Sequence, residues 1–185
     1  KYDFRRDLIW LILRPWILFP RFIQIVGAIS LLLARLIFQG SSNNYTTQKN
    51  LAKFLLRTLI DLGPCFIKVG QALSTRPDLI RKDWLEELTN LQDNLPAFSH
   101  AQALQIIESE LGKPANELFE EFPSGPIASA SLGQVYKARL NKNYWVAVKV
   151  QRPHLIFNIR RDIVIIKILG VFSAPILPLN LGFGL

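Results

Sequence analysis

The stretch that decides the fold is PIASASLGQVYKARLNKNYWVAVKVQRP, residues 126–153. Two runs within it, 135–140 and 145–150, are rich in β-branched and aromatic residues, and a short polar segment with two asparagines separates them. Such runs around a short connection predict an antiparallel hairpin. Small residues fill 128–134, directly before the hairpin, so we expect a tight loop and a three-stranded antiparallel sheet over 126–150.

The second run alternates between two kinds of side chain. Val146, Val148 and Val150 share one strand face, whereas Ala147 and Lys149 share the other. A lone lysine on a strand is usually solvated, but here the small-residue loop is expected over the same face. A small-residue turn between strands, followed by a strand with Ala-x-Lys, forms the phosphate cradle of kinase-like N-lobes. We therefore expect Ala147 and Lys149 to face a cleft.

Helical periodicity dominates residues 51–122, upstream of the sheet. The first helix is expected to end at Leu62, and Pro64 is suited to the first turn of the second. The later helices are predicted from three signals: Asp83 as an N-cap with Leu85, Leu88 and Leu91; Ser99 to Gly112 with Leu104, Ile107 and Leu111 inward; and a short helix after Pro114.

The second of these helices has two distinct sides. The spacing predicts an apolar side with Phe66, Val69 and Leu73 and another side with Lys68, Gln71 and Thr75. Gly70 between them permits close approach of another backbone. Arg76, just after the helix, is expected either to pair with Asp78 or to brace the helix.

The first forty residues are apolar and basic. They contain 6 basic and 2 acidic side chains, whereas the whole chain has a net charge of +8. Their longest uncharged run, 22–34, is shorter than a usual membrane span. Pro15 and Pro20 are expected to interrupt any earlier helix, so we predict one helix over 21–39 that ends at Gly40. Ser41 to Asn50 is polar and is interpreted as a linker.

That helix has a narrow polar stripe made of Arg21, Gln24 and Arg35. Three arrangements fit: a helix lying in the headgroup region, a marginal membrane span, or a helix buried against the protein. The single cysteine, Cys65, and the distant His100 and His154 exclude a disulfide scaffold and a zinc ribbon. The pattern of residues 160–170 predicts a helix that is ended by Pro175 and Pro178. Its inward residues are expected to be Ile163, Ile166 and either Ile168 or Leu169, with Asp162 on its polar face.

Four motifs, in order, resemble the UbiB/AarF/ADCK family of atypical kinases, most closely its plastid and cyanobacterial members. FIKVGQALSTRPDL at 66–79 is similar to the family's K-x-G-Q motif, and LTNLQD at 88–93 with Pro96 is similar to its continuation. PIASASLGQVY at 126–136 is similar to the alanine-rich loop, and VAVKVQRP at 146–153 is similar to the lysine strand.

The resemblance implies an α+β fold: a protein kinase-like N-lobe with an antiparallel sheet plus a helix, preceded by a helical extension and a hydrophobic N-terminal helix. The implied division is 1–40 membrane-associating, 41–50 linker, 51–122 K-x-G-Q extension and 123–185 incomplete N-lobe, with the C-lobe absent. ATP or ADP is the implied ligand. The site residues that the resemblance assigns are Lys149, Lys68 and Gln71 as catalytic, and Ala128, Ser129, Ala130, Ser131, Gly133, Val135, Ala147 and Lys149 as nucleotide-binding.

The resemblance also implies a role in isoprenoid quinone or prenyl-lipid metabolism at a membrane. The expected setting is a plastid, thylakoid or cyanobacterial membrane, with bacterial or mitochondrial inner membranes as alternatives. Expected partners are a lipid surface and quinone-biosynthesis proteins or prenyl lipids, and no nucleic acid. The catalytic Asp and Asn and the Mg²⁺ ligands are expected beyond Leu185, so no metal ligand is assigned and the fragment alone is expected to be inactive. The alternative is a pseudokinase-like membrane scaffold without phosphoryl transfer.

Overall fold

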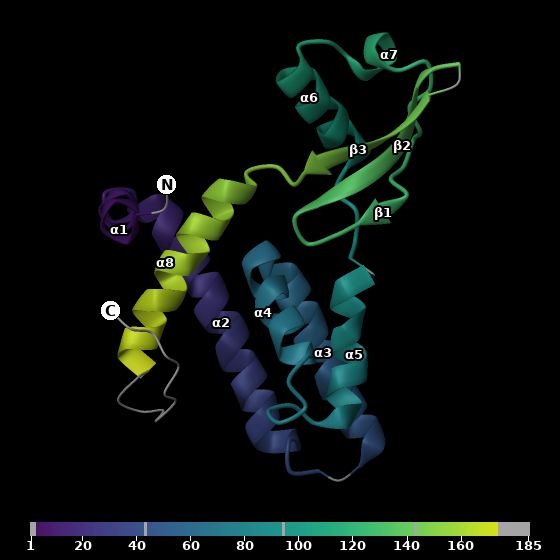
Figure 1. The fold of residues 1–185 in the computed structure, drawn as a ribbon. Helices are drawn as coiled ribbons and strands as arrows, with labels where there is room; N and C mark the ends of the chain where they lie inside the picture. Colours follow the sequence, from purple (N-terminus) through teal and green to yellow (C-terminus); the bar gives the residue numbers. More distant parts are fainter. Residues whose placement is uncertain (1–2, 43, 94, 143, 174–185) are drawn as a thin grey trace. The chain divides into compact units, whose positions relative to one another are not determined.

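The computed structural model describes residues 3–42, 44–93, 95–142 and 144–173. The elements, shown in Figure 1, are α1 (Phe4–Ile12), α2 (Pro15–Gln39), α3 (Tyr45–Leu62), α4 (Pro64–Ser74), α5 (Lys82–Asp93), α6 (His100–Leu111), α7 (Ala115–Leu118), β1 (Ala128–Ser129), β2 (Gly133–Asn141), β3 (Tyr144–Gln151) and α8 (Leu155–Ser173). The chain forms two compact units. We call 31–155 the central unit and 1–30 with 156–185 the terminal unit.

The sheet of the central unit has three antiparallel strands in the order β1-β2-β3, as predicted. Its inner face packs on α6 and α7 around Tyr136, which is 0% exposed. The Tyr136 ring lies 4.8 Å from the Phe122 ring and 5.8 Å from the His100 ring. Val148 and Val150 join this core, whereas Ala147 and Lys149 are exposed on the other face. The predicted alternation of β3 is therefore confirmed.

The helices α3, α4 and α5 pack together as a small bundle within the central unit. Gly70 of α4 is buried there, and a Cβ at this position would collide with the side chains of Leu91 and Leu59. The close neighbours of Gly70 are thus leucine side chains of α5 and α3, and not the backbone of another segment as predicted. The buried residues of α4 are Phe66, Ile67 and Gly70, whereas Val69, on the predicted apolar side with Phe66, is 44% exposed.

The bundle begins earlier than expected, because α3 starts at Tyr45 inside the predicted linker. Asn44 caps the helix by accepting a hydrogen bond from the Thr46 amide at 2.9 Å. One turn later Gln48, 1% exposed, donates to the Ser42 carbonyl at 2.7 Å and accepts from the Trp84 indole at 3.1 Å. These bonds make a polar stretch part of the fold.

Three details of the later helices also differ from the sequence prediction. Asp83 lies in the first turn of α5, where its carboxylate pairs with Arg81 at 3.2 Å, and is not the N-cap. Leu111 is 56% exposed, since it ends α6 just before the left-handed Gly112, while Ala103 takes the inward position. Arg76 pairs with Asp78 at 2.7 Å, which settles that alternative in favour of the local pair.

In the terminal unit, α1 and the first half of α2 are helical. Pro20 does not interrupt the helix as expected, since α2 begins at Pro15 and runs through Pro20 to Gln39. Proline removes one backbone hydrogen bond, the one to Trp16, and Trp16 is 69% exposed. Among the described residues, α2 is the helix with the length and composition of a membrane span. Only 6% of its apolar 18-residue segment is buried.

The helix α8 follows the lysine strand, and its Asp162 is buried, with 1% of the residue exposed. The prediction that Asp162 lies on the polar face was therefore wrong. Its carboxylate binds Arg21 of α2 in a two-pronged ion pair, with Nε–Oδ1 at 3.0 Å and Nη2–Oδ2 at 2.6 Å. Val164 and Ile165 are the buried apolar residues next to it, while Pro175 and Pro178 lie outside the described residues.

Candidate functional site

The register of the sheet brings three of the predicted nucleotide-binding residues into one row. Ala128 of β1 lies opposite Val135 of β2, and Val135 lies opposite Lys149 of β3. Residues directly opposite in antiparallel strands project to the same face. In the next row, Ala147 lies opposite Lys137. The exposed face thus presents an ammonium group beside alanine and valine, an arrangement suited to a phosphate next to a flat apolar base.

Ser129 and Ser131 do not join this face. Ser129 lies in the row of Gln134 and Val150, on the inner face, and its hydroxyl donates to the Pro96 carbonyl at 3.2 Å. Ser131 is 3% exposed. The amide of Ala130 is also occupied, because it donates to the Gly133 carbonyl at 2.8 Å and closes the turn. The loop can therefore offer other amides to a phosphate, but not this one.

Gly133 has a structural role at the start of β2. A Cβ on Gly133 would collide with the Val150 carbonyl oxygen of β3. Only glycine lets the two strands approach so closely at this point. The absence of a side chain on Gly133 therefore allows the start of β2 to lie close to β3, the strand that carries Lys149.

The side chain of Arg152 is hydrogen-bonded to the alanine-rich loop. The Arg152 guanidinium donates through Nε to the Ala130 carbonyl at 3.2 Å and through Nη2 to the Pro96 carbonyl at 2.8 Å. Its own backbone amide donates to the Leu132 carbonyl at 3.0 Å. Burial lowers the pKa of Arg152 from its ordinary value. Arg152 belongs to the lysine-strand motif, but the sequence does not indicate its role, because its hydrogen-bond partners lie 22 and 56 residues away.

Gln134 makes a second link to the same connecting segment. It is 0% exposed, accepts from the Phe98 amide at 3.0 Å, and donates to the Tyr136 hydroxyl at 2.6 Å. Burial raises the pKa of Tyr136, and the bond from Gln134 acts in the opposite direction. Arg152 and Gln134 together fix the loop and the sheet to residues 95–98, which lead in from α5.

The K-x-G-Q residues are used in different ways. Lys68 is exposed on α4, whereas the Gln71 amide donates to the Leu91 carbonyl at 2.7 Å. Leu91 is in the last turn of α5, where carbonyls have no partner within the helix, so Gln71 completes that helix end. Gly70 contacts the Leu91 side chain as well. Two residues of the motif thus fasten α4 to α5, and the placement of Lys68 over a nucleotide stays a prediction.

The described residues do not form a candidate metal site. Within the described ranges, 3–173 with gaps at 43, 94 and 143, there is no group of three or more His, Cys, Asp or Glu side chains that could hold an ion. The residues on the open sheet face fit the nucleotide itself, since Lys149 supplies a cation and Ala147 leaves space. We assign no residue of this chain to Mg²⁺.

The comparison with protein families identifies the class of protein. Residues 90–178, the segment that contains the sheet, Lys149 and α8, match the ABC1 atypical kinase-like domain. The predicted relationship to UbiB/AarF/ADCK proteins of the plastid and cyanobacterial kind is confirmed.

Individual relatives come from a cyanobacterium and from chloroplasts. The chain is 44% identical to the uncharacterized protein slr1919 of Synechocystis over 175 residues, 93% of this chain and 31% of that protein. It is 48% identical to the chloroplastic protein ACTIVITY OF BC1 COMPLEX KINASE 1 of Arabidopsis thaliana over 122 residues, 65% of this chain and 18% of that protein. An uncharacterized chloroplastic aarF domain-containing protein kinase of the same plant, At1g71810, is 43% identical over 156 residues, 83% of this chain and 22% of that protein. The chain therefore spans less than a third of the length of these relatives.

Proposed function

We propose that this chain is the nucleotide-gripping part of an atypical kinase or ATPase that acts at a membrane in isoprenoid quinone or prenyl-lipid metabolism. The observation that carries the proposal is the row Ala128–Val135–Lys149 across three strands, with Ala147 beside it on the exposed face. The match of residues 90–178 to an atypical kinase-like domain supports it. A plastid or cyanobacterial membrane is the proposed location, because the relatives come from these sources.

In this proposal Lys149 binds the nucleotide phosphates. An ammonium group that donates to an anionic oxygen contributes about 1.5–3 kcal/mol, since such hydrogen bonds are charge-assisted. Ala147 keeps the adjacent surface flat for the adenine. Arg152 and Gly133 hold the loop of 128–131 in position next to this surface.

The helical bundle contributes the second part of the proposal. Gly70 and Gln71 fix α4 on α5, and Lys68, exposed on α4, is the residue proposed to act on the phosphates or on the acceptor. A helix in that place restricts what can enter the site. We therefore propose small or membrane-delivered acceptors in preference to peptides.

The test is a nucleotide titration of the full-length protein with and without Lys149→Ala. We expect the substitution to weaken ATP or ADP binding about 10- to 100-fold, the loss of one charge-assisted bond. Lys137→Ala is the matched control, because Lys137 is exposed on the same face one row away, with its ammonium 4.9 Å from the Trp145 ring centre. Equal losses in both variants would show only a general effect of positive charge and would contradict the proposal.

A membrane scaffold without phosphoryl transfer is the second candidate, since the exposed apolar residues of α1, α2 and α8 would serve it equally well. The two candidates differ in turnover. ATP hydrolysis by the full-length parent that falls in Lys149→Ala and shifts in rate or acceptor choice in Lys68→Ala supports the enzyme. Nucleotide-independent behaviour of all three proteins supports the scaffold.

A further inference from the structure

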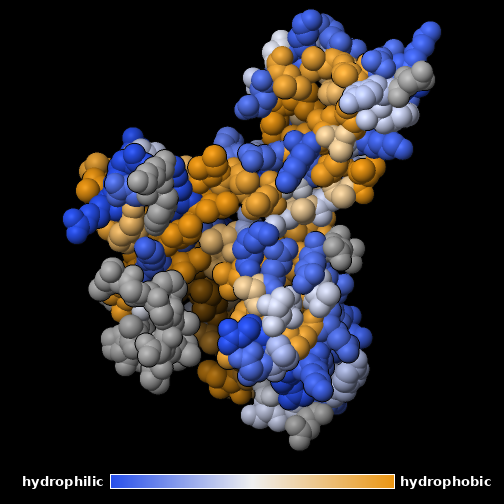
Figure 2. Space-filling model, in the orientation of Figure 1, coloured by the Kyte–Doolittle hydropathy of each residue, from blue (hydrophilic) through white to orange (hydrophobic). Residues whose placement is uncertain are grey.

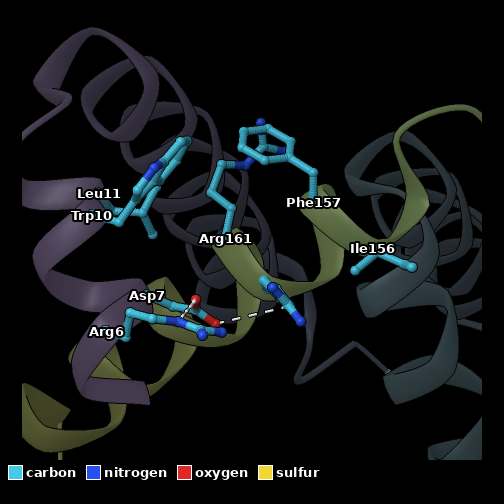
Figure 3. Close-up of a pocket in the computed structure, with 8 residues that line it drawn as sticks. Arg6, Asp7, Trp10, Leu11, Ile156, Phe157 and Arg161 are labelled. Atoms are coloured by element: carbon cyan, nitrogen blue, oxygen red, sulfur yellow. Dashed lines mark ion pairs between the residues drawn. The ribbon is translucent and has the colours of Figure 1, made fainter. Parts of the chain in front are cut away.

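The terminal unit contains a pocket of about 580 Å³ between α1 and α8 (Figure 3). This volume is within the usual range for small-molecule sites, roughly 300–1,000 Å³. The lining residues come from residues 6–11 of α1 and 156–161 of α8. They are Arg6, Asp7, Trp10, Leu11, Ile156, Phe157, Arg160 and Arg161. None of these residues belongs to the sheet face that carries Lys149.

One wall of the pocket is aromatic. The rings of Trp10 and Phe157 meet edge to face with their centres 5.8 Å apart, and Ile156 next to them is 65% exposed. Exposed apolar side chains also occur outside the pocket lining: Ile9 of α1 and Leu13, the residue that caps this helix, are 59% and 67% exposed. Figure 2 shows hydrophobic side chains at the surface over α8 as well. A pocket whose apolar wall runs on into an exposed apolar surface is suited to a chain that enters from a lipid layer.

The pocket lining also contains charged side chains, and these are mainly basic: Arg6, Arg160 and Arg161 with Asp7. Asp7 pairs with Arg6, whose Nε is 3.8 Å from Oδ1 (Figure 3), and with Arg160, whose Nε is 4.0 Å from Oδ2. Arg161 donates to Asp162, a carboxylate that Arg21 already binds with both oxygens. Arginines thus exceed carboxylates around the pocket, which favours an anion with several oxygen atoms.

A further detail defines the polar end. Asp7 Oδ2 is buried, yet it accepts no hydrogen bond from any residue that the structure describes. A buried carboxylate oxygen without a donor is unfavourable, so a ligand that brings a hydroxyl group would stabilise it.

We propose that this pocket binds the head group of an acidic phospholipid that carries a hydroxyl group, such as phosphatidylglycerol. The phosphate binds to Arg160 and Arg161, the head-group hydroxyl donates to Asp7 Oδ2, and an acyl chain lies against Trp10 and Phe157. This inference rests on the proposed membrane association and adds the lipid that it selects. It does not depend on nucleotide binding.

The experiment is vesicle co-sedimentation of the full-length protein, with phosphatidylcholine vesicles and with the same vesicles containing phosphatidylglycerol. We expect phosphatidylglycerol to increase binding at least 10-fold, and Arg160→Gln with Arg161→Gln to remove that increase. The matched control is Lys53→Gln with Arg57→Gln, which removes the same charge from exposed positions of α3. It is expected to change binding less than 2-fold.

A conservative pair of variants keeps the test valid if the neutral pair folds poorly. Arg160→Lys with Arg161→Lys preserves charge but loses the planar two-pronged geometry, so we expect a several-fold loss of the phosphatidylglycerol preference. Parent-like preference in this variant, or equal losses in the α3 control, would mean that diffuse charge attracts the protein and would overturn the pocket. Binding to both vesicle types without preference would overturn it while leaving membrane association intact. Saturable binding of sn-glycerol 3-phosphate without any vesicle binding would also overturn it.

Discussion

The buried ion pair between Arg21 and Asp162 allows a quantitative prediction for Arg21→Leu. The two side chains are 11% and 1% exposed and are joined by two short hydrogen bonds. Removing one partner of a buried pair leaves an uncompensated charge and destabilises by about 3–5 kcal/mol. Arg161, whose Nε lies 3.1 Å from Asp162 Oδ1, compensates part of the loss. We therefore expect a decrease of about 3 kcal/mol, at the lower end of that range.

The assay is urea unfolding of the full-length protein in detergent micelles, followed by circular dichroism. Arg21→Leu with Asp162→Leu removes the charge together with its partner, and we expect it to recover to within about 1 kcal/mol of the parent. Arg76→Leu is the control, because the Arg76–Asp78 pair is exposed and is expected to leave the free energy of unfolding unchanged. The reasoning is refuted if Arg21→Leu behaves like Arg76→Leu, or if the double variant is no more stable than the single one.

Three further predictions concern the central unit. Gly70→Ala is expected to destabilise this unit by about 1–3 kcal/mol in thermal unfolding, since the new methyl group would displace Leu91 and Leu59. The control is Ala72→Ser at an exposed position of α4, and equal effects of the two substitutions would contradict the packing role of Gly70. Arg152→Lys is expected to weaken nucleotide binding about 3- to 10-fold and to speed amide hydrogen exchange in residues 128–133, because one ammonium cannot reach both the Ala130 and Pro96 carbonyls; unchanged exchange would argue against a positioning role. The raised pKa of Tyr136 means that its contribution to stability is complete below about pH 10 and is lost as pH rises through the folded-state value. Ultraviolet titration is therefore expected to show one late-ionising phenol that is absent from Tyr136→Phe.

Strand periodicity predicted the sheet well because its information is local. Val148 and Lys149 are neighbours in the sequence, and a period of two is enough to place them on opposite faces. The register of the three strands follows from the same alternation and from the tight turn before β2. The row that contains Lys149 could therefore be expected from residues 126–150 alone.

The errors arose where a partner is distant or where a residue has no side chain to signal its place. Asp162 looks like a surface acid in its own helix, since the arginine that buries it lies 141 residues earlier. On α4 a buried position belongs to Gly70, which has no side chain to signal burial, whereas the apolar Val69 is exposed. Gln48 appeared to be part of a polar linker, because its carbonyl and indole partners are contributed by tertiary structure.

The ion pair between Arg21 and Asp162 also has a consequence for the order in which the protein forms during synthesis. The central unit can fold once its own residues have been made, whereas α1 and the start of α2 must wait for α8. At translation rates of roughly 5–20 residues per second, the 141 residues between the two partners take roughly 7–30 s. During that interval Trp10 and Leu11 have no helix α8 beside them. A nearby lipid surface could hold these side chains while the second half of the terminal unit is still being synthesised.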